Sequence, residues 1–339
     1  PRDRVRHALF RQPVDRLPTQ INYTPSMGAL LCQHLGVSPA ELPARLGNHL
    51  LRVDISFPRA ASPDGSTVYD WWGAGWSAET EGYWHTLAPL AENDDLDAFP
   101  WPDPTAPSLL HEARRALQAN SGRVFAVPNL GFALYERAWS LRGYEQLNLD
   151  LALRPAWVEE LLERITVVQE ELARRFVGAG VDGGYLGDDY GAQRGLLFAP
   201  RTWRQMIKPR LARLFAGFRQ TDLPVILHSD GDIQTILPDL VEIGLNGLNP
   251  VQPEVLDLAW LRRTFGASLA YYGGVSTQQV LPVGRPDEVA AAVAACVSAL
   301  ADDGTGLLLG PSHRMQSDIP MANIDALLAA MAQLTEAKR

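Results

Sequence analysis

From about residue 123 to its end, the chain alternates short apolar runs with longer stretches in which apolar residues recur at helical spacing. In the stretch 154–176, for example, Trp157, Leu161, Ile165, Val168 and Leu172 define one helix face. The apolar runs predict strands at 123–128, 183–186, 224–227, 247–251, 269–272 and 306–309. The amphipathic stretches predict helices at 154–176, 200–220, 232–243, 254–265, 286–300 and 321–334. Alternation of this kind is typical of parallel strands joined by helical crossovers.

Two further apolar runs, at 19–23 and 50–57, bring the predicted strands to the eight of a barrel. We therefore predict an α/β fold, a single TIM (β/α)8 barrel with an amphipathic N-terminal helix, over residues 1–339. A doubly wound sheet is the alternative, and Gly178-Ala-Gly180-Val-Asp-Gly183 does match its glycine pattern. This stretch follows a helix and precedes a strand, which is the reverse of the dinucleotide-binding context, so we interpret it as a turn.

An aromatic-rich insertion, at about 58–120, separates the second and third predicted strands. It contains five of the nine tryptophans, and its tyrosines and tryptophans are Tyr69, Trp71, Trp72, Trp76, Tyr83, Trp84 and Trp101. The glycines at 73 and 75 predict a β-hairpin at the C-terminal mouth of the barrel. Two interpretations stay open: a satellite core that packs the insertion down, or an aromatic lid over a substrate.

Composition narrows the function classes. Apolar residues make up 46% of the chain, and a net charge of −9 argues against nucleic acid or an anionic membrane as the main partner. The arginines of the first sixteen residues are interpreted as a solvated helix face. Cys32 and Cys296 form no CxxC, and neither a signal segment nor a membrane span is visible, so we expect a cytoplasmic protein. Neither Lys208 nor Lys338 follows a strand, which argues against Schiff-base chemistry.

Active sites of barrels lie at the C-terminal ends of the strands, and here those positions are rich in acids and histidines. The residues are Asp54, Asp188, Asp189, His228, Asp230, Asp232, Asn249, Gln252, Gly273, Gly274, Ser312, His313 and Arg314. Imidazole and carboxylate groups at one mouth suit a divalent metal or metal-free acid–base chemistry. The alternative for any one of them is structural, as a hydrogen-bonded histidine or a helix-capping aspartate. Gly273 and Gly274 predict a backbone anion site or a plain turn.

Seven segments, which span nearly the whole chain, resemble the uroporphyrinogen decarboxylase-like superfamily. They are RDRVRHALFRQPVDRLP (2–18), YDWWGAGW (69–76), LAENDDLDAFPWPDP (90–104), YLGDDYGAQRGLLFAPRTWRQMIKPRL (185–211), HSDGDIQTILPDLVEIGLNGLNPVQ (228–252), YYGGVSTQQVLPVGRPDEV (271–289) and GPSHRMQSDIPMANIDALL (310–328). The resemblance implies a TIM barrel and one of two chemistries: decarboxylation of tetrapyrrole acetate arms without a cofactor, or zinc-assisted methyl transfer in corrinoid systems.

The motifs favour the methyltransferase branch. The decarboxylases carry an arginine-containing motif near the first strand, whereas the matching stretch INYTPSMG (21–28) has no arginine, although Asp54 matches the aspartate after their second strand. The methyltransferases bind zinc through a His-x-Cys motif after strand 5 and a later cysteine near strand 8. Here His228 matches the histidine, Asp230 stands in place of the cysteine, and the last loop offers His313. This harder ligand set lowers the preference for zinc over manganese or iron.

The leading hypothesis is a metal-assisted methyltransferase or demethylase that acts on a small methylated compound. His228, Asp230 and His313 would hold a divalent metal, zinc or else manganese or iron, and Asp188 or Asp189 would assist. A corrinoid carried by a partner protein is the expected second component, and a monomer and a homodimer are both left open. One alternative is a metal-free decarboxylase that uses Asp54 as acid–base group with Tyr135 nearby. Another is a non-catalytic corrinoid- or tetrapyrrole-binding protein.

Overall fold

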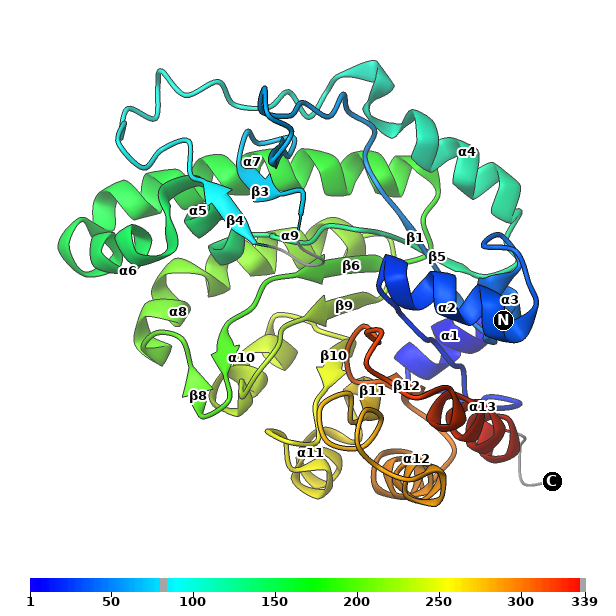
Figure 1. The fold of residues 1–339 in the computed structure, drawn as a ribbon. Helices are drawn as coiled ribbons and strands as arrows, with labels where there is room; N and C mark the ends of the chain where they lie inside the picture. Colours follow the sequence, from blue (N-terminus) through cyan, green and yellow to red (C-terminus); the bar gives the residue numbers. More distant parts are fainter. Residues whose placement is uncertain (80–83, 336–339) are drawn as a thin grey trace.

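A computed structural model describes residues 1–79 and 84–335 (Figure 1). Its parallel strands in the described part of the chain are β1 (Leu50–Val53), β5 (Phe125–Pro128), β6 (Gly184–Gly187), β9 (Val225–His228), β10 (Gly247–Val251), β11 (Ala270–Val275) and β12 (Leu307–Pro311). Five of them form a sheet in the order β12-β11-β10-β9-β6, and β1 pairs with β5 in a second one. The fold is thus α/β with a central parallel sheet, as the apolar runs predict.

The run at 19–23 was expected to be a strand, and the structure corrects this prediction. Only single parallel bridges form there, between Thr19 and Leu309 and between Tyr23 and Met315. Between them the Asn48 side chain accepts from the N–H of Ile21 at 2.8 Å and donates to its carbonyl at 3.0 Å. A side-chain amide therefore takes the backbone groups that a continuous strand would have paired.

Helices surround the strands (Figure 1). They are α1 (Arg2–Leu9), α2 (Pro25–Leu35), α3 (Leu42–Arg45), α4 (His111–Asn120), α5 (Tyr135–Arg142), α6 (Tyr144–Leu153), α7 (Pro155–Ala179), α8 (Pro200–Met206), α9 (Lys208–Arg219), α10 (Leu237–Glu242), α11 (Leu258–Phe265), α12 (Pro286–Leu300) and α13 (Met321–Thr335), with 3-10 turns at Pro107–Leu110 and Gln234–Ile236. None of the helices within the described ranges combines the length and the apolar character needed to cross a membrane.

Local residues explain most helix ends. Helix α7 begins at Pro155 and ends before Gly180, whose φ of 92° closes the helix in a left-handed turn, so the glycine pattern at 178–183 is an αβ turn as interpreted. The single helix expected at 200–220 is instead α8 and α9, which meet at Ile207. The cause is Pro209, which has no N–H to donate and would clash with the preceding turn.

Helix α1 packs against the N-terminal ends of the strands. Its Val5 and Leu9 join a buried cluster with residues that open the strands, among them Leu50, Phe125 and Ala270. Four of the five arginines of this segment make side-chain contacts, which corrects in part the interpretation of a solvated face: Arg2, still half exposed, pairs with Asp182, Arg4 with Asp15 and His49, Arg6 with the carbonyl of Asp222, and Arg11 with the carbonyl of Leu269 and with Asp303. The opposite, C-terminal ends of the strands are left for a site.

The first part of the insertion contains a three-stranded antiparallel sheet of β2 (Thr67–Tyr69), β3 (Gly75–Ser77) and β4 (His85–Leu87), so the hairpin predicted around the two glycines is present, and its last part is the helix α4. Its tryptophans mostly pack on one another and on α5: Trp72 lies edge-on to Trp71 and Trp101, and Trp76 contacts Trp139. Trp84 is 69% exposed, and the predicted aromatic Tyr83 lies outside the described residues. This packing agrees with the satellite-core interpretation.

Short antiparallel strands β7 (Gly191–Ala192) and β8 (Gly195–Leu196) form a hairpin in the loop that follows β6. The hairpin lies against the loop after β9, because the N–H of Asp232 donates to the carbonyl of Ala192 at 2.8 Å. The close contact requires glycine: a Cβ on Gly191 or Gly231 would stand within 2.7 Å of the backbone of the other loop. Two loops at the C-terminal ends of neighbouring strands are thus locked together.

Candidate metal centre

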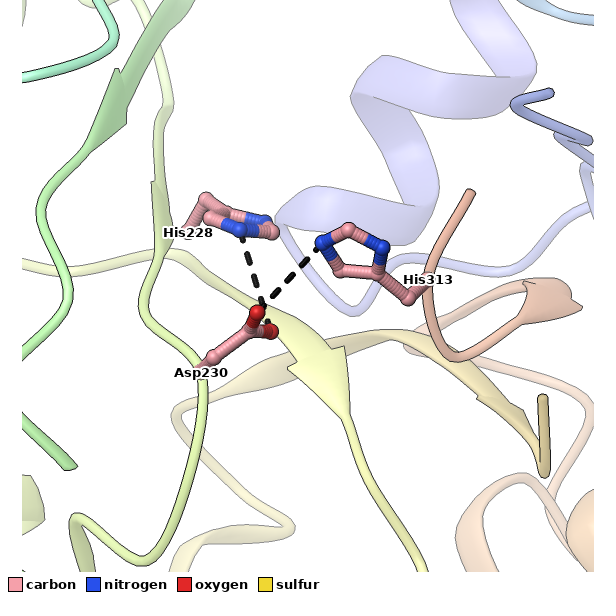
Figure 2. A group of neighbouring side chains, drawn as sticks. All are labelled: His228, Asp230 and His313. Atoms are coloured by element: carbon pink, nitrogen blue, oxygen red, sulfur yellow. Dashed lines mark ion pairs between the residues drawn. The ribbon is translucent and has the colours of Figure 1, made fainter. Parts of the chain in front are cut away.

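Three side chains converge at the C-terminal ends of β9 and β12 (Figure 2). His228 is the last residue of β9, Asp230 follows two positions later, and His313 lies just beyond β12. The Asp230 carboxylate lies between the two imidazoles, at 3.8 Å from Nε2 of His228 and 3.4 Å from Nε2 of His313. One nitrogen or oxygen atom from each residue lies within 4.8 Å of the others. Residues 85 positions apart in sequence therefore form one cluster, as predicted.

The surroundings of this cluster favour the neutral form of His313. Burial lowers the pKa of His313, an effect that the adjacent Asp230 carboxylate opposes and that His228 and Arg314 reinforce. A neutral imidazole has a free lone pair, which is the form that ligates a metal. Two imidazole nitrogens and one carboxylate suit Zn²⁺, Mn²⁺ or Fe²⁺, and three protein ligands leave coordination positions open for a reactant. The donor set thus fits a divalent ion.

Asp189 extends the cluster. Its Oδ1 lies 3.9 Å from Nε2 of His228 and accepts a hydrogen bond of 2.9 Å from the N–H of Asp230. Burial raises the pKa of Asp189, His228 lowers it and Asp230 raises it. Glu136, on α5, is a further acid here that sequence reasoning missed, and burial together with the charges of Asp189 and Asp188 holds its pKa well above the usual range. Because Glu136 follows no strand, its place on the chain gave no signal.

Asp188 points elsewhere. It is fully buried, and its carboxylate accepts hydrogen bonds from the N–H groups of Leu134, Tyr135 and Glu136, at 3.2, 2.8 and 2.7 Å. These are the unpaired donors at the start of α5. Burial raises the pKa of Asp188, while the N–H groups of Glu136 and Tyr135 and the hydroxyl of Tyr190 act in the opposite direction. The structure thus gives Asp188 a capping position on α5, in contrast to its neighbour Asp189.

The two residues expected for the metal-free alternative have separate surroundings. Asp54 is exposed and accepts a hydrogen bond of 2.7 Å from Asn129, beside a cavity of about 420 Å³ that Arg52 and Arg59 also line. Tyr135 is buried, and its hydroxyl bonds to Asn148 on α6. Among the described residues, these two side chains share no hydrogen-bond partner. Their joint action remains a prediction.

Gly273 and Gly274 lie inside β11 rather than after it, because this strand continues to Val275. They pair with Leu309 and Gly310 of β12, with φ values of 114° and 98°. A Cβ on Gly274 would lie 2.3 Å from the sulfur of Cys296. The structure therefore gives a steric and conformational reason for glycine at this point, and the predicted anion site remains a prediction.

The other predicted strand-end residues mostly bind neighbouring backbone or side chains. Asp232 accepts from the N–H of Gln234 at 3.0 Å, which is the capping alternative considered for it. Gln252 accepts from the N–H of Gly231, and Ser312 bonds to Thr277 at 3.2 Å. Asn249 differs, because its side chain reaches the Nδ1 atom of His228 at 2.8 Å. It is the strand-end residue that directly contacts a member of the cluster from the neighbouring strand.

Comparisons with known proteins agree with this architecture. The family model described as "Uroporphyrinogen decarboxylase (URO-D)" matches residues 86–334. A methyltransferase from Methanosarcina mazei has a similar fold, with a TM-score of 0.73, 20% identity and 97% of each chain covered. A B12-independent methionine synthase from a Shewanella species, in complex with selenomethionine, gives a TM-score of 0.49 and 11% identity over 96% of this chain and 97% of the other. No curated protein matches the chain.

Proposed function

Because the chain belongs to the uroporphyrinogen decarboxylase family, we propose that it is a metal-assisted methyltransferase or demethylase acting on a small methylated compound. The observation that carries this proposal is the cluster of His228, Asp230 and His313, whose ligand atoms lie within 4.8 Å of one another at the C-terminal ends of two strands. Enzymes built on such strands place their chemistry at this end. A purely structural set would not need two imidazoles and a carboxylate at one point.

His228 and His313 would ligate through their neutral imidazoles and Asp230 through a carboxylate oxygen. A divalent ion bound there would supply Lewis acidity, which polarises the nitrogen, sulfur or oxygen that carries the methyl group and makes it a better leaving group. We favour zinc, with manganese and iron as alternatives for this oxygen-containing ligand set. Asp230 also offsets the positive charge of the ion.

We assign the assisting role to Asp189 rather than to Asp188. Asp189 faces the imidazole of His228 at 3.9 Å, whereas Asp188 is engaged by three N–H groups of α5. Burial raises the pKa of Asp189, His228 lowers it and Asp230 raises it. Asp189 would give a proton to the nitrogen, sulfur or oxygen from which the methyl group leaves.

A corrinoid on a separate protein is the partner we propose for the methyl group. The resemblance of the motif around His228 to corrinoid-system methyltransferases supports it. The probe is free cob(I)alamin with a panel of methylated amines, thioethers and alcohols, followed by the conversion of its absorbance spectrum to that of methylcobalamin. Turnover of one panel member that disappears in His228→Ala supports the proposal.

Metal content tests the centre directly. The wild type, His228→Ala and His313→Ala are purified, loaded with Zn²⁺, Mn²⁺ or Fe²⁺, desalted and analysed by plasma mass spectrometry. His34→Ala is the matched control, because His34 pairs at 2.8 Å with Asp325, which is not a member of the cluster. We expect one ion per wild-type and control chain and less in the two cluster variants. No stoichiometric ion in the wild type with any of the three metals would refute the metal centre.

A decarboxylase is the second candidate, favoured by the cavity of about 420 Å³ beside Asp54. Arg52 and Arg59 line this cavity and could pair with a substrate carboxylate, while Asp54 would exchange a proton. Carbon dioxide release that survives chelation and is lost in Asp54→Asn would support this candidate. Release that depends on an added metal would count against it.

We further infer that the strands close into one barrel over residues 1–339. The segment at 18–19 connects the edge strands β1 and β12. The N–H of His49, just before β1, donates to the carbonyl of Thr19 at 3.1 Å, and the N–H of Leu309 in β12 donates to the carbonyl of Pro18 at 2.9 Å. A parallel bridge between Leu130 and Leu186 joins the other edges. A crystal structure with a continuous ring of strand contacts would confirm this.

A further inference from the structure

We propose that Asn249 is a positioning residue that holds His228 in the tautomer protonated on Nδ1, so that the lone pair on Nε2 faces Asp230 and His313. This inference rests on the proposed metal centre and names what orients one of its ligands. The starting observation is the contact of 2.8 Å between Nδ1 of His228 and Oδ1 of Asn249. The strand register produces it, because His228 of β9 and Asn249 of β10 are direct partners.

The orientation of the Asn249 amide follows from its other contact. Its Nδ2 lies 3.2 Å from the carbonyl oxygen of Tyr272 in β11. A carbonyl oxygen can only accept, so the NH₂ group must face Tyr272 and the oxygen must face His228. Asn249 is 4% exposed, so water cannot easily replace either contact. The amide oxygen therefore points at Nδ1.

A second chain of hydrogen bonds, from Arg52 through Tyr185, ends at the same amide oxygen. Arg52 Nη2 lies 2.6 Å from the hydroxyl of Tyr185, and an arginine can only donate. The Tyr185 hydroxyl thus accepts from Arg52 and is free to donate its hydrogen to Oδ1 of Asn249, at 2.7 Å. The arginine side chain also lies 4.0 Å above the Tyr185 ring, which holds that ring in place.

An amide oxygen has no hydrogen, so the contact with His228 exists only if Nδ1 carries one. In the neutral imidazole, a hydrogen on Nδ1 leaves Nε2 as the unprotonated nitrogen. Nε2 is the atom that lies 3.8 Å from Asp230 and 3.9 Å from Asp189. Histidines that ligate metals commonly donate their second ring N–H to a fixed acceptor, which orients the ring. Here that acceptor is an amide held by three strands.

The first test reads the tautomer without any metal. Protein labelled with ¹⁵N histidine is studied at about pH 8, well above the ordinary histidine pKa of about 6.5, by long-range ¹H–¹⁵N correlation, and His228→Gln assigns the signal among the seven histidines. We expect a protonated, pyrrole-type Nδ1 and a pyridine-type Nε2 for His228. The opposite pattern, or a mixture of both tautomers, would overturn the inference even if the protein binds a metal.

The second test measures metal affinity by competition with a chromophoric chelator. Asn249→Leu removes the acceptor with little change in volume, and we expect a loss of about 10- to 100-fold in affinity. Asn249→Asp keeps an oxygen that can accept from Nδ1 of His228 but loses the donor to the Tyr272 carbonyl, so we expect an affinity between those of Asn249→Leu and the wild type. Asn323→Leu is the matched control, because Asn323 is a similarly buried amide whose side chain, among the described residues, donates to the carbonyls of Leu281 and Gly284.

The outcomes separate this inference from the proposed function. No metal bound by the wild type refutes the metal centre and leaves the tautomer measurement as the test of Asn249. Metal bound equally by the wild type, Asn249→Leu and Asn323→Leu refutes the positioning role and leaves the metal centre intact. If Asn249→Leu does not fold, the tautomer of His228 in the wild type decides, and a hydrogen on Nε2 in place of Nδ1 would overturn the role assigned here.

Discussion

The insertion should depend for its stability on one buried ion pair, between Asp70 and Arg137. Arg137 Nη1 donates to Oδ2 of Asp70 at 2.6 Å, and the side chains are 8% and 21% exposed. The other contacts of Asp70 lie within its own hairpin: it accepts from the N–H groups of Trp72 and Ala74, at 2.9 and 3.0 Å, and from the indole of Trp76 at 3.2 Å. This carboxylate therefore joins the hairpin to α5, beside the contact of 2.8 Å between the His85 ring and the carbonyl of Ser140.

Asp70→Ala should cost about 4 kcal/mol in the free energy of unfolding. Removing one partner of a buried pair typically costs about 3–5 kcal/mol, because the other charge stays buried without compensation. Burial lowers the pKa of Arg137, and Asp70 raises it, so this guanidinium does depend on its partner. Replacing both residues, as in Asp70→Ala with Arg137→Met, removes the stranded charge. The double variant should be more stable than the sum of the two single losses predicts, by about 1–3 kcal/mol.

Urea unfolding followed by tryptophan fluorescence measures these free energies, and hydrogen exchange of residues 67–79 reports whether the insertion opens first. Asp94→Ala is the control, because Asp94 forms an ion pair of 2.7 Å with Arg154 in which both side chains are well exposed. We expect no measurable change there, since solvent screens such pairs. Equal losses for Asp70→Ala and Asp94→Ala, or single losses that simply add in the double variant, would refute the reasoning.

Three further outcomes are expected. Burial lowers the pKa of His49 to about 4 from its ordinary 6.5, so between these pH values the folded protein binds fewer protons than the unfolded protein. The free energy of unfolding should therefore decrease as the pH is lowered from 6.5 to 4, by up to about 3 kcal/mol at about 1.4 kcal/mol per pH unit. Urea midpoints of the wild type and His49→Gln across this range measure the difference, and parallel curves would contradict it. Asp188→Ala leaves three N–H groups at the start of α5 without an acceptor and should lower the free energy of unfolding by about 3 kcal/mol or more. Its metal affinity, measured by chelator competition, should change less than threefold, and a larger loss of affinity at full stability would make Asp188 part of the centre. Gly274→Ala places a Cβ 2.3 Å from the sulfur of Cys296 at a φ of 98° and should lower the free energy of unfolding by about 2–4 kcal/mol. In thermal unfolding, adding Cys296→Ala should restore only part of this loss, because the backbone strain at residue 274 remains. Full recovery in the double variant would show that only the clash mattered.

The periodicity of the chain determined most of the secondary structure. The strand at 247–251 and the helix at 286–300 have the bounds that the pattern predicts, because a buried parallel strand needs a short apolar run and a covering helix needs one apolar face. These requirements are local, so they are legible in sequence. The same holds for the ends of α7, where proline and glycine act through their own backbone preferences.

Long-range partners decided the exceptions. The segment at 19–23 has the pattern of a strand, but the Asn48 side chain takes the backbone groups of Ile21. Gly273 and Gly274 read as a turn, but their pairing with β12 continues the strand. No local pattern shows which side chain or neighbouring strand will supply a backbone group with its partner.

The candidate centre divides in the same way. Knowing that parallel strands share one active end limited the candidates to residues that follow strands, and the family resemblance singled out His228, Asp230 and His313 among them. Only the tertiary structure distinguished Asp189, which faces His228, from Asp188, which caps α5, and only it placed the Asn249 side chain against Nδ1 of His228. Strand ends fix which residues reach the mouth, whereas the direction in which each side chain points depends on donors and acceptors supplied by distant parts of the chain.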